Sequence, residues 1–229
     1  MHIPDGFIDA PVSLAAGGVA IVGVGVALRK TREVLAEKEI ALAGLTSAFI
    51  FAVQMLNFPV ASGTSGHLMG GVLAAVLVGP WTGALCVTVV LVVQALVFAD
   101  GGLSALGLNI VNMALVGALG GWVIFRGLRL LLPDNHAGVT IAAGVAAGLS
   151  VVLSSVAFAL EYALGGTADL SLASVLTAMV GVHTLIGIGE GLITGLVVAA
   201  VLGARPDLVV GAADLALPQP LDRAAEVPI

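Results

Sequence analysis

Charged residues are scarce in this chain: Asp, Glu, Lys and Arg make up only 10% of its 229 residues, against about a quarter in soluble domains. Apolar residues make up 59%, and the mean hydropathy is +1.17. The net charge of −6 argues against a nucleic-acid partner, which would need a basic face. The composition therefore excludes an ordinary soluble domain and indicates an integral membrane protein.

Cysteine and catalytic motifs are nearly absent as well. The single cysteine, Cys86, lies in an apolar run, so we expect a small buried side chain rather than a disulfide or a Cys-based metal site. No phosphate-binding Gly-x-x-x-x-Gly-Lys-Ser/Thr loop is present, so the chain should not hydrolyse ATP itself. Without a Ser/His/Asp order or a His-Glu-x-x-His motif, we predict a protein that is not an enzyme and needs no catalytic cofactor.

The first residues lack the basic charge that begins a cleaved signal peptide. Asp5 and Asp9 precede the first apolar run, and no lysine or arginine does. A secretory signal needs a positively charged start. We therefore expect the first apolar segment to be retained as a membrane span.

Seven apolar segments are candidates for membrane-spanning helices, each of which needs about 20 residues. They are 12–28, 40–56, 68–79, 84–99, 106–125, 139–160 and one within 172–204. We predict an all-α membrane protein, a bundle of seven transmembrane helices in a single domain at 1–204, followed by a flexible cytoplasmic tail at 205–229.

The last apolar segment is too long for an ordinary span. As one helix, residues 172–204 would extend for roughly 50 Å, against about 30 Å of hydrocarbon. We expect the part before His183 to be an interfacial helix, a loop or a strongly tilted region.

The basic residues predict which side of the membrane each end faces. All eight follow the first, fifth or seventh segment, and they are Arg29, Lys30, Arg32, Lys38, Arg126, Arg129, Arg205 and Arg223. Lys and Arg favour the cytoplasmic side. These positions share one face only if the N-terminus is outside and the number of spans is odd. Met1, His2 and the loop at 57–67 should then lie together on the outer side.

The N-terminal Met-His pair can chelate a metal ion. The α-amine and the next amide nitrogen close a five-membered ring on a metal, and that amide nitrogen and Nδ1 of His2 close a six-membered ring. Four nitrogens in a plane suit Ni(II), Cu(II) or low-spin Co(II) better than Zn(II). His67, which ends a loop predicted to be on the same face, could supply the fourth nitrogen. The alternatives are a frayed, solvated end for His2 and a loop histidine bound to a carbonyl for His67.

Three other ionisable residues are candidates for a functional role. His136 falls in a loop predicted to be cytoplasmic, so we expect a solvated turn that cannot share a site with His2. His183 and Glu190 are seven residues apart and therefore on one face of a helix. Intramembrane ionisable residues are functional candidates. For this pair we favour hydrogen bonding inside the bundle over a transient ion contact.

Three stretches together resemble one known family. They are Met-His-Ile-Pro-Asp-Gly-Phe at 1–7, Asn-Phe-Pro-Val-Ala-Ser-Gly-Thr-Ser-Gly-His-Leu at 57–68 and Val-His-Thr-Leu-Ile-Gly-Ile-Gly-Glu-Gly-Leu-Ile-Thr at 182–194. They resemble the CbiM/NikM family, the cobalt- and nickel-specific substrate-binding subunits of energy-coupling factor transporters. The likeness covers nearly the whole chain up to the tail.

The resemblance implies a ligand set. In that family the metal is held by the terminal amine, by the amide and imidazole nitrogens of the second residue, and by a loop histidine. These roles fall on Met1, His2 and His67. Further candidates for orienting these ligands or lining the metal's path are Asn57, Ser65, His183 and Glu190.

The resemblance also implies a function and partners. It implies a seven-helix fold and capture of Co(II) for ATP-driven uptake that serves cobalamin synthesis, with Ni(II) as the alternative. The implied partners are a transmembrane coupling subunit, two ABC-type ATPases and a small accessory membrane subunit, in the inner membrane of a bacterium. Two other hypotheses stay open: a stand-alone ion-coupled transporter that uses His183 and Glu190, and a purely structural membrane subunit.

Overall fold

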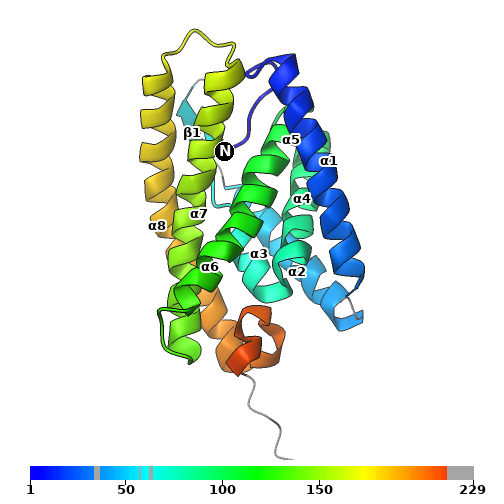
Figure 1. Cartoon of the computed structure of the whole chain (residues 1–229), viewed down its shortest axis with the longest axis vertical. Helices are drawn as coiled ribbons and strands as arrows, with labels where there is room; N and C mark the ends of the chain where they lie inside the picture. The colour runs from blue at the N-terminus through cyan, green and yellow to red at the C-terminus, as the bar shows by residue number, and fades with distance from the viewer. Residues whose placement is uncertain (34–36, 57, 62–63, 216–229) are drawn as a thin grey trace, which may run out of the picture.

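The chain folds into a bundle of helices around a short, wholly buried helix (Figure 1). The computed structural model describes residues 1–33, 37–56, 58–61 and 64–215, and for 37–39, 58–61 and 64–65 it describes the backbone alone. The α-helices are α1 (Ala10–Arg32), α2 (Glu37–Gln54), α3 (Gly71–Val78), α4 (Pro80–Val97), α5 (Leu106–Asn109), α6 (Gly121–Arg129), α7 (His136–Gly165) and α8 (Leu172–Ala204).

The remaining elements are short. A π-helical segment, η1 (Ile110–Gly120), joins α5 to α6 without a break. Two strands, β1 (Phe58–Ala61) and β2 (Thr64–Gly66), form an antiparallel hairpin in the loop that precedes α3. Two 3₁₀ helices, η2 (Pro206–Leu208) and η3 (Val210–Leu215), follow α8.

Five helical stretches in the described residues are long and apolar enough to cross a membrane. They are α1, α4, the continuous run Leu106–Arg129, α7 and α8. The apolar part of α2, Ile40–Gln54, is shorter, and α3 has only eight residues. The prediction of a helical, multi-pass membrane protein is confirmed, whereas the count of seven spans and the orientation of the ends stay predictions.

Helix α3 lies at the centre of the bundle. All eight of its residues are buried, and it packs against α4, η1 and α7. Gly70, which precedes α3, adopts a left-handed backbone (φ 72°), and a Cβ there would lie 2.7 Å from Cγ1 of Ile50. This glycine therefore sets the turn that leads from the loop of His67 into the core.

Glycines bring α7 and α8 into backbone contact. A Cβ on Gly187 would lie 2.7 Å from the carbonyl oxygen of Gly148, and a Cβ on Gly191 would lie 2.7 Å from that of Gly144. Small residues allow such close approach of helices in lipid. Because the two backbones touch, the larger side chains on either side of the contact point outward.

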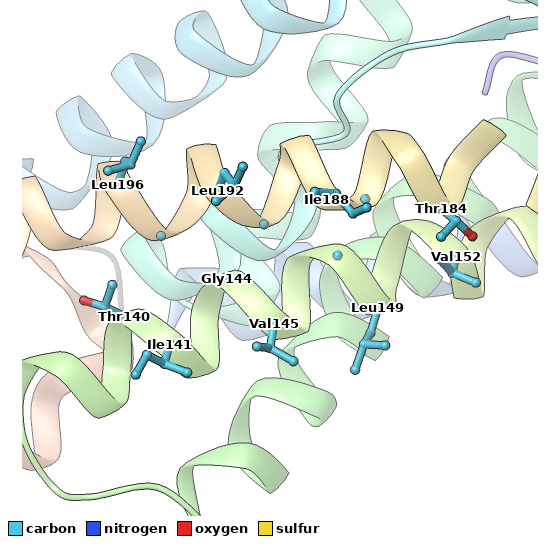
Figure 2. A pocket seen from close by; sticks show the side chains of 14 residues that line it. Thr140, Ile141, Gly144, Val145, Leu149, Val152, Thr184, Ile188, Leu192 and Leu196 are labelled. Carbon is cyan, nitrogen blue, oxygen red and sulfur yellow. The ribbon is translucent and has the colours of Figure 1, made fainter. Parts of the chain in front are cut away.

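Those larger side chains line an open apolar groove between the two helices. In Figure 2, Val145 and Leu149 lie on the α7 side of it, and Ile188 and Leu192 lie on the α8 side. All four side chains are exposed in the isolated chain. An apolar surface of this kind suits the lipid environment that the composition predicts.

Two of the three arrangements predicted before His183, an interfacial helix and a loop, are wrong. Helix α8 is continuous for 33 residues, and Ser171 caps its start by accepting a hydrogen bond from the amide of Ser174 at 3.1 Å. No proline interrupts the segment, and its glycines pack on α7 instead of breaking the helix. A separate interfacial helix or a loop is excluded there, and a tilt stays a prediction.

The predicted tail begins later than residue 205. Residues 206–215 form η2 and η3, in which Ala212 is buried, and Val209 between them is buried too. Nη2 of the buried Arg129 lies 3.2 Å from Oδ2 of Asp214, which ties η3 to α6. The flexible tail stays a prediction for residues 216–229, which lie outside the described residues.

The glycine contact between α7 and α8 can be tested with one matched pair of substitutions. Gly187→Ala should lower the free energy of unfolding by about 1–3 kcal/mol, because its Cβ would meet a backbone oxygen that cannot rotate away. Gly181→Ala, on the same helix with nothing within 4 Å of the new Cβ, should be neutral or stabilising. Thermal unfolding of the purified proteins in detergent measures both, and equal melting temperatures for the two variants would contradict this packing.

Candidate metal-binding site

The N-terminus of the chain is folded into the bundle. Met1 and Ile3 are 0% exposed, and His2 is 3% exposed. Figure 1 marks the N-terminus among the helices, away from the ends of the bundle. Terminal residues are usually disordered unless something holds them. The alternative of a frayed, solvated end for His2 is therefore wrong.

Asn109 holds the N-terminal segment by its main chain. The amide of Ile3 donates to Oδ1 of Asn109 at 2.8 Å, and Nδ2 of Asn109 donates to the carbonyl of Ile3 at 3.3 Å. The amide of Gly102 donates to the same carbonyl at 2.8 Å. A Cβ on Gly102 would overlap the backbone of Asp5, so only glycine fits there.

A tight turn at Asp5 and Gly6 directs the segment inward. Phe7 donates its amide to the carbonyl of Pro4 at 3.4 Å, and Gly6 has a left-handed φ of 73°. Oδ1 of Asp5 accepts from the hydroxyl of Ser104 at 2.6 Å and from its amide at 2.7 Å. These hydrogen bonds lower the pKa of Asp5, so the carboxylate that anchors the turn is ionised at neutral pH.

His2 and His67 lie against each other although they are 65 residues apart in the sequence. Their ring centroids are 4.5 Å apart and the rings are stacked at 28°. Nδ1 of His2 lies 2.9 Å from Oδ1 of Asp100, which is within ion-pair distance. The amide of Asp100 donates to the carbonyl of Gln94 at 3.1 Å, so the end of α4 positions this carboxylate.

The contact of His67 with its own backbone determines where its lone pair lies. Nδ1 of His67 is 2.8 Å from the carbonyl oxygen of Leu68. A carbonyl oxygen only accepts, so Nδ1 carries the hydrogen and Nε2 carries the lone pair. Nε2 is buried and has no hydrogen-bond partner among the described residues. A buried imidazole nitrogen with a lone pair and no hydrogen-bond partner is available to bind a metal ion.

Burial keeps the nitrogen donors of this site uncharged. It lowers the pKa of the Met1 amine to about 4, partly opposed by the negative charge of Asp100. Burial also lowers the pKa of His2, and it lowers the pKa of His67 well below its usual range, with help from the nearby Met1 amine, His2 and His183. At neutral pH the amine and both imidazoles are therefore uncharged, and metals bind to the uncharged forms of these groups.

Glu190 fixes the segment that follows His67. Its two carboxylate oxygens accept the amides of Met69 at 2.7 Å and of Gly70 at 2.6 Å. The side chain of Gln54 donates to the carbonyl of Met69 at 2.7 Å. Helices α8 and α2 thus hold the loop of His67 from two sides, and Glu190 lies where a residue that orients this ligand would have to be.

His183 is buried on the same face of α8 as Glu190. Its Nδ1 lies 2.7 Å from the carbonyl of Met179, one turn earlier, which accounts for the expected hydrogen bond inside the bundle. Its Nε2 is buried without a hydrogen-bond partner among the described residues.

The remaining residues singled out from the sequence contribute little here. Asn57 lies outside the described residues, and Ser65 is described only as backbone in β2. His136 is exposed at the start of α7, at the opposite end of the bundle from the N-terminal segment, as expected for a solvated turn. Cys86 is buried, as expected, and its Sγ contacts the carbonyl of Ala43 at 3.5 Å.

Two residues of the site were missed in the sequence. They are Asp100 and Asn109, neither of which was singled out there. Asn109 did carry a signal, because an amide inside an apolar run has to find a partner when it is buried. Nothing in the sequence indicated that this partner would be the backbone of residue 3.

Side chains alone do not complete a metal site. No group of three or more His, Cys, Asp or Glu side chains in the described part of the chain is arranged to hold a metal. A four-nitrogen site at His2 and His67 therefore requires the terminal amine and a backbone amide as well. Nδ1 of His2, which would close the chelate ring, is engaged with Asp100, so binding must break this contact.

Comparisons with known proteins relate the chain to metal transport proteins. Residues 2–208 match the family described as "Cobalt uptake substrate-specific transmembrane region". A putative metal transport protein of Haloquadratum walsbyi is 41% identical, over 91% of this chain and 93% of that protein. A putative fused nickel transport protein of Archaeoglobus fulgidus is 38% identical, over 91% of this chain and 68% of that protein. The crystal structure of a truncated transition metal transporter matches with a TM-score of 0.78 at 32% identity, over 89% of this chain and 99% of that one.

The role of Glu190 in placing His67 leads to a prediction. Glu190→Gln should weaken Co(II) binding by about 10- to 100-fold, because the amide nitrogen that replaces one carboxylate oxygen donates and cannot accept the backbone amide that this oxygen binds. Glu161→Gln is the matched control, since this part-buried carboxylate on α7 accepts from the side chain of Asn112 instead. Calorimetric titration of the purified proteins with Co(II) measures the effect. Equal affinities for Glu190→Gln and the unaltered protein would show that Glu190 does not position the ligand.

Proposed function

The chain belongs to the CbiM family of cobalt and nickel transport membrane proteins, and from this premise we propose that it captures Co(II) with nitrogen atoms of Met1, His2 and His67. The observation that carries the proposal is the buried N-terminal segment, in which His2 is stacked on His67. Burial of the terminus costs free energy, since its amine loses favourable hydration, and metal binding by the amine would offset this cost.

The proposed site uses four nitrogens from three residues. The Met1 amine, the amide nitrogen of His2 and Nδ1 of His2 form two fused chelate rings in one plane. Nε2 of His67, which is buried and has no hydrogen-bond partner among the described residues, fills the fourth position. The amide of His2 loses its proton when it binds the metal. Four nitrogen donors in a plane favour Co(II), Ni(II) or Cu(II) over Zn(II).

The choice between cobalt and nickel depends on more than this donor set. The four nitrogens would serve either ion, and the natural affinity order places copper above both. We propose Co(II) as the principal substrate and Ni(II) as the alternative. The family description supports cobalt, and the fused nickel transport protein among the relatives supports the alternative.

An added N-terminal residue should abolish metal capture. One extra residue before Met1 replaces the amine by an amide and moves the new amine out of chelate range. We expect purified protein with this extension to retain no Co(II) after desalting, as measured by elemental analysis. The control is the same residue added after Ile229, at the other end of the chain, which should retain one Co(II) per chain. Full retention by the N-terminally extended protein would eliminate the proposed site.

We further propose that this subunit works with partners in an energy-coupling factor transporter. These are a transmembrane coupling subunit, two ABC-type ATPases and a small accessory membrane subunit. The absence of a phosphate-binding loop from the sequence supports an external source of energy. In this proposal the N-terminus faces outward, the C-terminus faces the cytoplasm of a bacterial cell, and the imported cobalt serves cobalamin synthesis.

Reconstituted vesicles can distinguish this assembly from a stand-alone ion-coupled transporter. Uptake of radioactive Co(II) should require the coupling and ATPase subunits. It should also require ATP on the side of the membrane where the ATPase subunits lie. A proton gradient without these subunits should give no uptake above that of empty vesicles. Uptake that follows the proton gradient in vesicles containing this chain alone would favour the ion-coupled alternative instead.

A further inference from the structure

Nε2 of His183 is a buried imidazole nitrogen that the proposed site does not use. His183 on α8 is 0% exposed, and its Nδ1 is 2.7 Å from the carbonyl oxygen of Met179. Because that oxygen only accepts, Nδ1 carries the hydrogen and Nε2 carries the lone pair. Nε2 is buried with no hydrogen-bond partner among the described residues. The tautomer and the bare lone pair are the same as those of His67.

An unpartnered nitrogen of this kind is costly to bury. A buried acceptor without a donor lowers stability, because it has given up its hydrogen bonds to water without replacing them. The hydrogen bond to Met179 explains how the ring is oriented but leaves Nε2 unexplained. Buried unsatisfied groups in a native structure often belong to a functional site. The question is therefore whether His183 lies close enough to the proposed metal to be used.

Two observations place His183 beside the proposed site. Glu190, seven residues further along the same face of α8, accepts the amides of Met69 and Gly70, so this face of α8 lies directly against the segment that carries His67. Helix α8 also packs against β1 and β2, the hairpin that ends at Gly66, directly before His67. The fourth histidine of the chain, His136, is exposed and lies at the far end of the bundle.

We propose that Nε2 of His183 is a fifth ligand to the captured ion, bound outside the plane of the other four nitrogens. This inference rests on the proposed function. The four positions in the plane are taken by Met1, His2 and His67, so a fifth donor has to bind along the axis perpendicular to them. Helix α8 thereby joins the N-terminal segment and the loop in holding the ion.

An axial nitrogen distinguishes cobalt from nickel. Low-spin Co(II) has seven d electrons and only one of them in the orbital along the axis, so it accepts an axial donor. Low-spin Ni(II) has eight d electrons and this orbital is full, so an axial lone pair is repelled. His183 therefore favours Co(II), whereas the four in-plane nitrogens serve either ion. This is selection by geometry, which the natural affinity order cannot provide.

Electron paramagnetic resonance tests the proposal directly. Purified protein loaded with Co(II) without oxygen should give a low-spin signal whose cobalt lines are split into triplets by one axial nitrogen. His183→Ala should keep the metal, lose the triplets and bind Co(II) at least about tenfold more weakly, with Ni(II) affinity unchanged. His136→Ala is the matched control and should keep both the triplets and the affinity. Triplets that persist in His183→Ala, or an unaltered protein without triplets, would overturn the inference.

A second measurement needs no substitution in the site. Labelling all histidines of the unaltered protein with nitrogen-15 should convert the triplets into doublets, because His183 is the axial donor. Unchanged triplets would assign the axial nitrogen to another residue type and overturn the inference. The two proposals can fail separately. His2→Ala and His67→Ala should release the metal whatever the axial ligand is. Metal retained by both variants would contradict the proposed function itself.

Discussion

The paired hydrogen bonds between Asn109 and the main chain of Ile3 hold the site together. They satisfy the amide and the carbonyl of a residue that is entirely buried, and removing the side chain of Asn109 would leave the buried amide of Ile3 without its acceptor. Burial of the segment then keeps the terminal amine and both imidazoles uncharged. One side chain at the end of α5 thus decides both the position and the protonation of the donors, and η1 begins at the next residue.

The donors are attached to different parts of the bundle. The N-terminal segment is held by α5 and by the loop that follows α4, whereas His67 is held through Glu190 on α8 and Gln54 on α2. An ion bound by both groups would link these helices. In the structure the two groups meet where the ring of His2 stacks on the ring of His67.

Much of the fold could be predicted because lipid imposes simple rules on sequence. Scarce charge and long apolar segments were enough to predict a helical membrane protein, and the start Met-His with a loop histidine indicated which groups would meet. The break expected before His183 was wrong, because length alone does not say whether a long helix bends or simply runs on. The tail was predicted to begin at residue 205, although residues 206–215 are folded. The contact between Asp214 and the buried Arg129 joins residues 85 positions apart, so no local pattern revealed it.

The sequence by itself was enough to predict a chelating unit, because amine, amide and imidazole follow one another along the covalent chain and their ring sizes need no fold. It also determined the membrane class, because hydropathy is a local property. Only the tertiary structure decided that the N-terminus is buried, that Asn109 holds it, that Glu190 binds the backbone after His67 and that Nε2 of His183 is buried without a hydrogen-bond partner among the described residues. These contacts join residues up to 121 positions apart. Packing brings such residues together, and no pattern of neighbouring residues specifies it.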